Sequence, residues 1–237
     1  METKINHRGE NHLLSLIAAG ERRRLIGRCD RIVPRLGAAL YEAEAPIGHV
    51  YFPLSGMVSL VIGTEEGRTI EVGTIGNEGM VGTAVALGSI AGIGRATVQV
   101  VGELLRMTTA AFKEELERRG GELAHVVQRF AQALTGQISQ SVACNQLHPI
   151  EQRICRWLLM THDRVGTDEI GLTQEFIAQM LGVRRPSVTV IAGALQRQGL
   201  IRYSRGRITV LDRKALEEGA CECYRMVRRD TERLLRA

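Results

Sequence analysis

Apolar and polar positions alternate with different periods along the chain, and these periods divide the sequence into successive stretches. Near the N-terminus, the pattern predicts an amphipathic helix over 12–29 whose apolar side holds Leu13, Leu14, Ile17, Leu25 and Ile26. From Val33 to about Arg106, short runs rich in β-branched residues alternate with glycine, proline and serine. Many short strands with regular turn signals are typical of a β-sandwich or a barrel-like roll. We expect strands at 49–52, 57–62, 69–75, 96–101 and 103–107.

The pattern returns to a helical period after Thr108. A short helix is expected over 110–119, and the pair Gly120-Gly121 ends it. A longer helix is expected over about 122–146, with a stripe of residues that alternate at steps of four and three, as in a coiled coil. This stripe comprises Val127, Ala131, Leu134, Ile138, Ser141 and Asn145. Two interpretations stay open: a core helix that packs on the β-roll, or a helix that joins two subunits.

A third pattern covers Leu172 to Leu211, where two short helical segments meet at Gly182. Thr173 is placed to cap the first segment, because a threonine side chain accepts a hydrogen bond from a free N–H of the first turn. Glycine adopts the left-handed conformation that reverses the chain after a helix. Pro186 begins the second segment, and two alternating runs around Arg205 predict a β-hairpin. Together these elements predict a helix-turn-helix followed by a wing.

The residues that such a fold would present to DNA share two properties: they are polar or cationic, and they occupy the start of a helix or the tip of the wing. An arginine can donate two hydrogen bonds to one guanine, and serine, threonine or glutamine can contact bases or phosphates. The candidate DNA contacts are Thr173, Gln174, Arg184, Arg185, Ser187, Thr189 and Arg205. The alternative interpretation is a helical hairpin whose charged side is merely solvated.

The distribution of charge favours DNA. The net charge is +5, yet residues 1–147 hold 15 basic and 15 acidic side chains, whereas residues 148–237 hold 16 basic and 11 acidic ones. No acidic residue occurs between Glu175 and Asp212, a stretch that contains six arginines. A basic surface of this kind attracts a polyanion. A neutral module joined to a basic one suggests that one senses a signal and the other binds nucleic acid.

The sequence gives no sign of export or of a membrane span. The first residues, METKINHRGENH, are polar, and no apolar signal segment follows them. The longest uncharged apolar stretch, Met80 to Gly94, is too short to cross a bilayer. Five scattered cysteines form no evident disulfide framework, which fits a reducing cytoplasm.

Several segments resemble those of one bacterial family. They are YEAEAPIGHVYFPLSGMVSLV, IGNEGMVG, ACNQLHPIEQRICRWLL and the helix-turn-helix with its wing, and in this order they resemble the Crp/Fnr superfamily of transcription regulators. The resemblance implies an α+β fold with a jelly-roll-like β-roll that is similar to cyclic-nucleotide-binding domains. It places the β-roll at 12–121, a dimerisation helix at 122–147, a winged helix-turn-helix at 148–214 and a C-terminal helical extension at 215–237.

The resemblance also implies a function. We expect a homodimeric, cytoplasmic regulator that binds a palindromic operator in double-stranded DNA, contacts RNA polymerase and responds to a signal at the β-roll. No Ser-His-Asp set, P-loop or dinucleotide turn suggests an enzyme. The alternative is a cyclic-nucleotide-responsive signalling module whose basic domain binds RNA or protein.

The sequence departs from the family at the cyclic-nucleotide pocket. Members that bind cyclic AMP have a Gly-Glu pair whose carboxylate holds the ribose, and here the matching place reads Gly82-Thr83. They also have an arginine for the cyclic phosphate, followed by a small residue and alanine. Here Arg95, followed directly by Ala96, lies near that place but one residue later. In a strand, one residue reverses the direction of the side chain. Gly82, Thr83, Arg95 and Ala96 are therefore the candidate effector pocket, yet we expect cyclic nucleotides to bind weakly or not at all, and we expect no other cofactor.

The pair Cys221 and Cys223 raises the question of a metal. On a helix, residues two apart do not face each other, and no second cysteine pair has zinc-site spacing. The six histidines show no ligand spacing either. We therefore expect no metal site.

Overall fold

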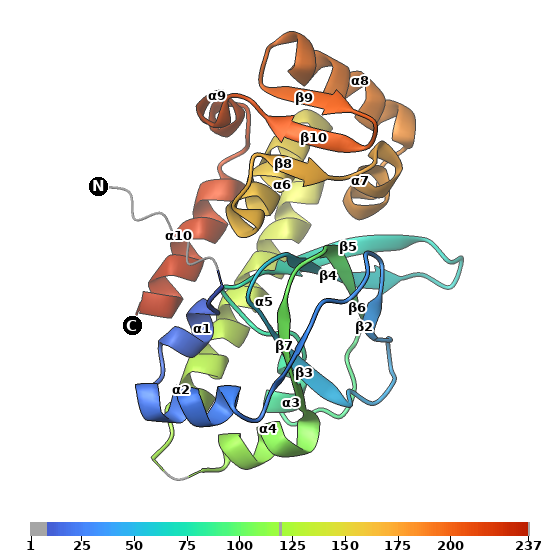
Figure 1. The fold of residues 1–237 in the computed structure, drawn as a ribbon. Coiled ribbons are helices and arrows are strands. Elements are labelled where there is room, and N and C mark those ends of the chain that lie inside the picture. Colours follow the sequence, from blue (N-terminus) through green and yellow to red (C-terminus); the bar gives the residue numbers. More distant parts are fainter. Residues whose placement is uncertain (1–8, 119, 237) are drawn as a thin grey trace.

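The computed structural model describes residues 9–118 and 120–236, and it stacks a β-roll, a helical middle and a winged helix-turn-helix (Figure 1). The β-roll has two antiparallel sheets around one apolar core. In order, the first sheet contains β1 (Asp30–Ile32), β7 (Leu104–Thr108) and β3 (His49–Pro53). The second contains β2 (Ala39–Tyr41), β6 (Arg95–Val100), β4 (Met57–Gly63) and β5 (Thr69–Ile75). The five expected strands are confirmed, whereas β1 and β2, three residues each, were too short to stand out.

Four short helices accompany the β-roll: α1 (His12–Ser15), α2 (Ala19–Ile26), α3 (Thr83–Ala86) and α4 (Thr109–Leu116). The prediction of a single helix over 12–29 is wrong, because the helix is interrupted between α1 and α2. At the break, the backbone N–H of Ala18 donates to Glu122 Oε2 at 2.8 Å instead of continuing a helix. Asn11 caps α1 through a 3.0 Å hydrogen bond from Leu14 N–H. The apolar pattern therefore predicted correctly that one side of this segment is buried, but it predicted one continuous helix where the structure has two.

The long helix α5 (Leu123–Leu147) is present as expected, but its apolar stripe faces inward. Val127 and Leu134 belong to the β-roll core, and Ile138 packs against it. Ala131 and Ser141 are also buried within the single chain. Val127, Leu134 and Ile138, which resembled part of a coiled-coil seam, therefore pack on the β-roll. A partner subunit that used α5 would have to contact the opposite side of the helix.

A second apolar core lies under the winged helix-turn-helix. Helix α6 (Ile150–Val165) enters it, and Pro149 is its N-cap. A three-stranded antiparallel sheet in the order β8-β10-β9 forms the wing. The remaining elements are β8 (Glu169–Gly171), α7 (Gln174–Leu181), α8 (Arg185–Arg197), β9 (Ile201–Ser204) and β10 (Arg207–Val210).

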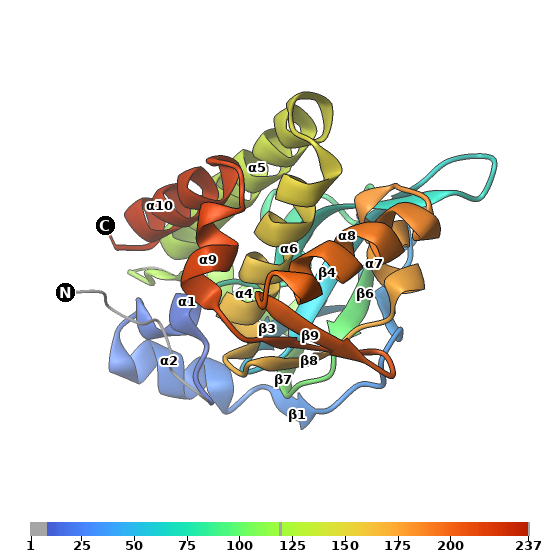
Figure 2. The same ribbon diagram turned by 90° about the horizontal axis from the view of Figure 1, so that it is seen from above.

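The C-terminal extension consists of α9 (Arg213–Glu218) and α10 (Cys223–Arg236), and α10 runs beside α5 (Figures 1 and 2). It joins both cores: Tyr224 and Val227 pack with the winged helix, and Leu235 packs with the β-roll. The extension is therefore part of the folded body and not an appended tail.

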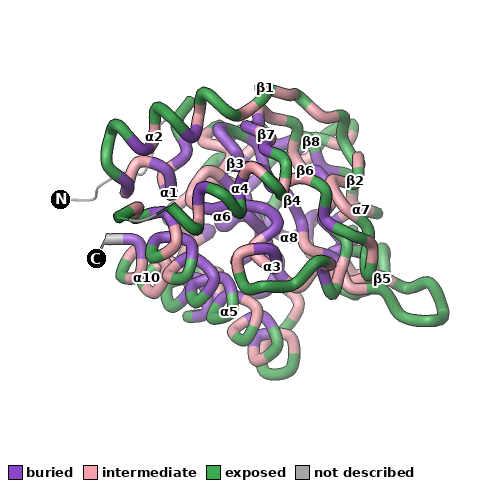
Figure 3. Tube along the Cα trace, turned by 90° about the horizontal axis from the view of Figure 1, so that it is seen from below, coloured by how far each residue is buried: buried purple, intermediate pink, exposed green. Residues whose placement is uncertain are grey.

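The buried apolar residues lie mainly inside the two cores, and the loop between β4 and β5 extends away from the body as an exposed hairpin tip (Figure 3). Among the described residues, every helix is too short or too polar to cross a lipid bilayer. The first eight residues, on which part of the expectation about export rested, lie outside the described residues.

Candidate DNA-binding surface and domain interface

The turn between α7 and α8 has the geometry that its sequence predicts. Thr173 Oγ1 accepts a 3.2 Å hydrogen bond from Phe176 N–H and so caps α7. Gly182 has φ of +63°, in the left-handed region where glycine is unstrained. Any side chain at this position would also collide with Ile70 of the β-roll, because an added Cβ would lie 2.8 Å from Ile70 Cδ1. Gly182 thus serves both the turn and the contact between domains.

Helix α8 buries one side and exposes the other. Val188, Ala192 and Leu195 are buried in the winged-helix core, and Ile191 is only partly buried. On the outer side, Arg184, Arg185 and Thr189 are exposed, and Ser187 is half-buried. The N-terminal turns of α8 therefore present cationic and hydroxyl groups to solvent, as a recognition helix does.

The candidate DNA contacts form one continuous surface. The Thr189 hydroxyl donates a 2.6 Å hydrogen bond to Gln174 Oε1, which links the first turns of α7 and α8. Gly206 in the wing lies beside the N-cap Thr173, since an added Cβ would be 3.5 Å from its methyl group. Arg205, at the tip of the wing, therefore lies next to the start of α7, which in turn contacts α8.

The tip of the wing is a two-residue turn. β9 and β10 pair from Ser204 with Arg207, so only Arg205 and Gly206 lie between them. Both have positive φ, +48° and +75°, as the tight turns of β-hairpins require. Arg205 is exposed at this tip. Arg207, by contrast, is paired with Glu169 of β8, a strand that the sequence did not reveal.

The candidate effector-pocket residues divide into two pairs. Gly82, with φ of +96°, precedes α3, and Thr83 is the first residue of that helix. Arg95 begins β6 on the exposed side, where it forms a 3.4 Å ion pair with Glu42, and Ala96 lies fully in the core. Within the described residues, no hydrogen bond or ion pair joins the two pairs. Arg95 and Ala96 face opposite sides of the sheet, as alternate strand residues do.

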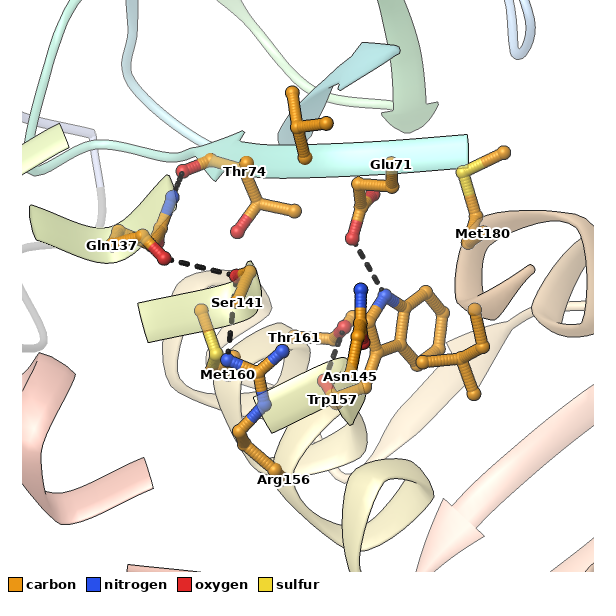
Figure 4. A pocket seen from close by; sticks show the side chains of 13 residues that line it. Glu71, Thr74, Gln137, Ser141, Asn145, Arg156, Trp157, Met160, Thr161 and Met180 are labelled. Carbon is orange, nitrogen blue, oxygen red and sulfur yellow. Dashed lines mark hydrogen bonds between the residues drawn. The ribbon is translucent and has the colours of Figure 1, made fainter. Parts of the chain in front are cut away.

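A contact that the sequence did not suggest joins β5 to α6. The Trp157 indole N–H donates to Glu71 Oε1 at 2.8 Å (Figure 4). The Ser59 hydroxyl donates to Glu71 Oε2 at 2.6 Å. A cavity of about 20 Å³ lies beside them between the two domains. Burial raises the pKa of Glu71 to about 7, although its hydrogen bonds from Ser59 and Trp157 oppose that shift.

Two further contacts hold the β-roll against the winged helix. Arg164 of α6 forms a 2.8 Å ion pair with Glu78, and both side chains are largely buried. Gln179 of α7 donates to Thr69 Oγ1 at 2.7 Å. The helix-turn-helix therefore touches the β4–β5 hairpin directly.

Four possible metal ligands also come together, contrary to the reasoning from the sequence. The premise that Cys221 and Cys223 share a helix is wrong: Cys221 lies in the connection after α9, and α10 begins at Cys223. Their side chains meet Cys144 and His148, one helical turn apart at the end of α5. This spacing of four residues was present in the sequence but was not recognised.

Two domain families match the chain in this order. The profile of the cyclic nucleotide-binding domain matches residues 35–119, and the profile of the Crp-like helix-turn-helix domain matches residues 152–218. The chain belongs to the Crp/Fnr superfamily. This Crp/Fnr protein is thus a transcription regulator with a DNA-binding helix-turn-helix and a domain of the cyclic-nucleotide-binding type.

Solved structures agree with this fold. FixK2 from Bradyrhizobium japonicum superposes with a TM-score of 0.70 at 14% identity, covering 81% of this chain and 98% of that one. A CRP-family transcriptional regulator from Thermus thermophilus gives 0.66 at 23% identity, covering 81% and 96%. The regulator CLP of Xanthomonas campestris, described as responsive to c-di-GMP, gives 0.65 at 15% identity, covering 82% and 100%. A comparison with curated protein sequences returns no match.

Proposed function

We propose that this Crp/Fnr protein binds an inverted repeat in double-stranded DNA as a homodimer. The observation that carries the proposal is the continuous exposed surface formed by the start of α8, the start of α7 and the tip of the wing. Arg184 and Arg185 would reach base edges, and Arg205 would contact the phosphate backbone. Ser187, Thr173, Gln174 and Thr189 would position the helices on the duplex.

The exposed side of α5 supports a dimer. Its residues recur at steps of four and three, so they share one face of the helix, and all but Val142 are polar. They are Gln128, Gln132, Thr135, Ser139, Val142 and Gln146. Val142 is an apolar residue that is 61% exposed in the single chain, and the small residues near Gly136 would let a second helix approach closely. Two subunits related by a twofold axis would place their recognition helices in successive major grooves.

The contact between the β4–β5 hairpin of the β-roll and the helix-turn-helix offers a route by which a signal could reach the DNA-binding surface. Because Gln179 and Gly182 of the helix-turn-helix touch Thr69 and Ile70, a shift of β5 would move the elements that hold α8. We therefore expect the β-roll to modulate DNA affinity. The departures at Thr83 and Arg95 argue against cyclic AMP as its signal. The regulator would act in the cytoplasm together with RNA polymerase.

The test is selection of duplexes from a random pool, followed by titration of the best sequence by fluorescence anisotropy. We expect a site with dyad symmetry, two chains bound per duplex by light scattering, and affinity that falls steeply as salt rises, because bound arginines release counterions. Single-stranded RNA of the same length is the matched competitor. A site without symmetry, or a preference for the RNA, would contradict the proposal.

A further inference from the structure

Three thiols and one imidazole converge where α5, α6 and the C-terminal extension meet. The ligand atoms of Cys144, His148, Cys221 and Cys223 all lie within 4.8 Å of one another. Cys144 Sγ is 3.5 Å from Cys221 Sγ, and Cys223 Sγ is 3.6 Å from His148 Nδ1. The three cysteines are at most 4% exposed and form a small cluster apart from the two main cores.

Two of these separations have the length expected for the edges of a tetrahedral zinc site. With zinc–sulfur bonds of about 2.3 Å and zinc–nitrogen bonds of about 2.0 Å, two sulfurs on one zinc lie about 3.8 Å apart, and a sulfur and a nitrogen about 3.5 Å apart. The separations of Cys144 from Cys221 and of Cys223 from His148 match these values to within a few tenths of an ångström. A Cys3His ligand set with no free position is typical of structural zinc sites.

The surroundings of the cluster are those of a metal site. His148 turns Nδ1 toward the thiols, and its Nε2 lies 3.2 Å from the Glu222 carboxylate. Metal-binding histidines commonly donate their other nitrogen to a carboxylate in this way, which fixes the ring. Gln140 Nε2 also donates to Cys223 Sγ at 3.0 Å, as a donor to a thiolate would.

Charge balance gives an independent argument. Three thiolates and one Zn²⁺ carry a net charge of −1. Arg153 and Arg156 are both more than nine-tenths buried on α6, and their charges interact with Cys144. The Nε atom of each has no hydrogen-bond partner among the described residues. Glu71 already faces Arg156, and a zinc–thiolate centre would supply a further nearby anion to these two buried cations.

We propose that Cys144, His148, Cys221 and Cys223 bind one zinc ion in a tetrahedral structural site. The site fastens the C-terminal extension to the junction of α5 and α6, where the sensor region meets the DNA-binding region. Zinc would replace the protons of the three thiols, so binding releases protons and stabilises the folded chain. The site is independent of the proposed DNA contacts, none of which belongs to it.

Other thiol chemistry fits the geometry less well. The ligands of an iron–sulfur cluster are divided among several irons, whereas these four atoms crowd around a single point. A disulfide between Cys144 and Cys221 would require their sulfurs to approach from 3.5 Å to about 2.05 Å, and it would leave Cys223 and His148 without a role.

The first experiment measures metal content in the full-length protein purified under reducing conditions. We expect one zinc per chain by elemental analysis. Replacement of zinc by Co²⁺ should give thiolate-to-cobalt charge-transfer bands and the intense visible absorption of a tetrahedral centre. A protein without bound metal, a protein with iron and inorganic sulfide, or a Cys144–Cys221 disulfide in non-reducing peptide maps would each overturn the proposal.

Variants locate the ligands. Cys221→Ser should lose the stoichiometric zinc, whereas Cys29→Ser, which alters a cysteine outside the cluster, should retain it. Glu222→Gln keeps all four ligands and alters an exposed side chain, so it remains informative if ligand variants fail to fold. Chelator competition should show zinc affinity lower by about 10- to 100-fold in Glu222→Gln. Unchanged affinity in Glu222→Gln together with retained zinc in Cys221→Ser would overturn the assignment.

Discussion

The indole N–H of Trp157 donates a hydrogen bond to the carboxylate of Glu71, and this 2.8 Å contact joins the winged-helix core to the β-roll. Glu71 sits on β5, and Trp157 sits on α6, so the bond crosses the boundary between the two halves. The charged groups that face it are Arg156 and Arg164, both from α6, and both favour the ionised carboxylate. Burial nevertheless dominates and raises the pKa of Glu71 to about 7.

This raised pKa predicts that stability falls as pH rises. Below about pH 4.5, Glu71 is protonated in both the folded and the unfolded chain. Between about 4.5 and about 7, the unfolded chain releases the proton while the folded chain keeps it, so the free energy of unfolding decreases. Above about pH 7 both forms are ionised, and the free energy of unfolding decreases no further on account of Glu71. Glu71→Gln should remove this dependence and gain about 1 to 3 kcal/mol at pH 8 relative to the wild type.

Urea unfolding at pH 5 and pH 8 measures the effect. Glu66→Gln is the matched control, because Glu66 is exposed in the neighbouring loop. It should change with pH as the wild type does. Equal pH dependence in Glu71→Gln and the wild type would show that the buried carboxylate does not control the interface.

The DNA-binding elements could be predicted from the sequence because each has a local signal. Thr173 at an N-cap, Gly182 in a left-handed turn, and Arg205-Gly206 in a hairpin turn each depend on neighbours within a few residues. The strands of the β-roll were visible for the same reason. The sequence could not decide what the apolar stripe of α5 contacts, because such a stripe looks the same whether it faces a sheet or a second subunit.

Contacts between distant segments could not be predicted. Glu71 and Trp157 are 86 residues apart, and nothing near either residue indicates that they meet. The cysteine cluster joins residues 144–148 to 221–223, and its recognition also required knowing that Cys221 lies outside a helix. The four-residue spacing of Cys144 and His148 was the one available signal, since the C-cap residue His148 follows Cys144 by one turn and its backbone N–H donates to the Cys144 carbonyl.

Arginines in the recognition helix and in the wing should have separable effects on DNA binding. Arg185→Ala should cost roughly 1–3 kcal/mol and relax the preference at one operator position, because a base-reading arginine is lost. Arg205→Ala should weaken all sequences alike and lower the salt slope by about 1. Anisotropy titrations on the selected operator and on single-base variants measure both. The roles would have to be exchanged if Arg205→Ala changed base preference and Arg185→Ala did not.

The two sides of α5 should respond differently to substitution. Val142→Glu places a charge on the exposed side and should dissociate the dimer without lowering helix content, since Val142 contacts solvent in the single chain. Leu134→Ala leaves a cavity in the β-roll core and should cost about 2–5 kcal/mol of stability. Light scattering and denaturant unfolding separate the two effects. If Val142→Glu remained dimeric, the subunits would have to meet through a different surface.

Cyclic nucleotides should bind weakly or not at all. Tight binding requires an acceptor for the ribose hydroxyl and a cation for the phosphate. Thr83 lacks a carboxylate, so it cannot make the charge-assisted hydrogen bond that is roughly twice as strong as a neutral one. Arg95 is half exposed and paired with Glu42, on the side of β6 opposite to the buried Ala96. A phosphate buried without its cation is strongly disfavoured. Isothermal titration with cyclic AMP and cyclic GMP should therefore show no saturable heat at micromolar concentrations. A micromolar dissociation constant that Arg95→Ala abolishes would mean that Arg95 turns inward when the ligand binds, and that the strand register does not prevent a phosphate contact.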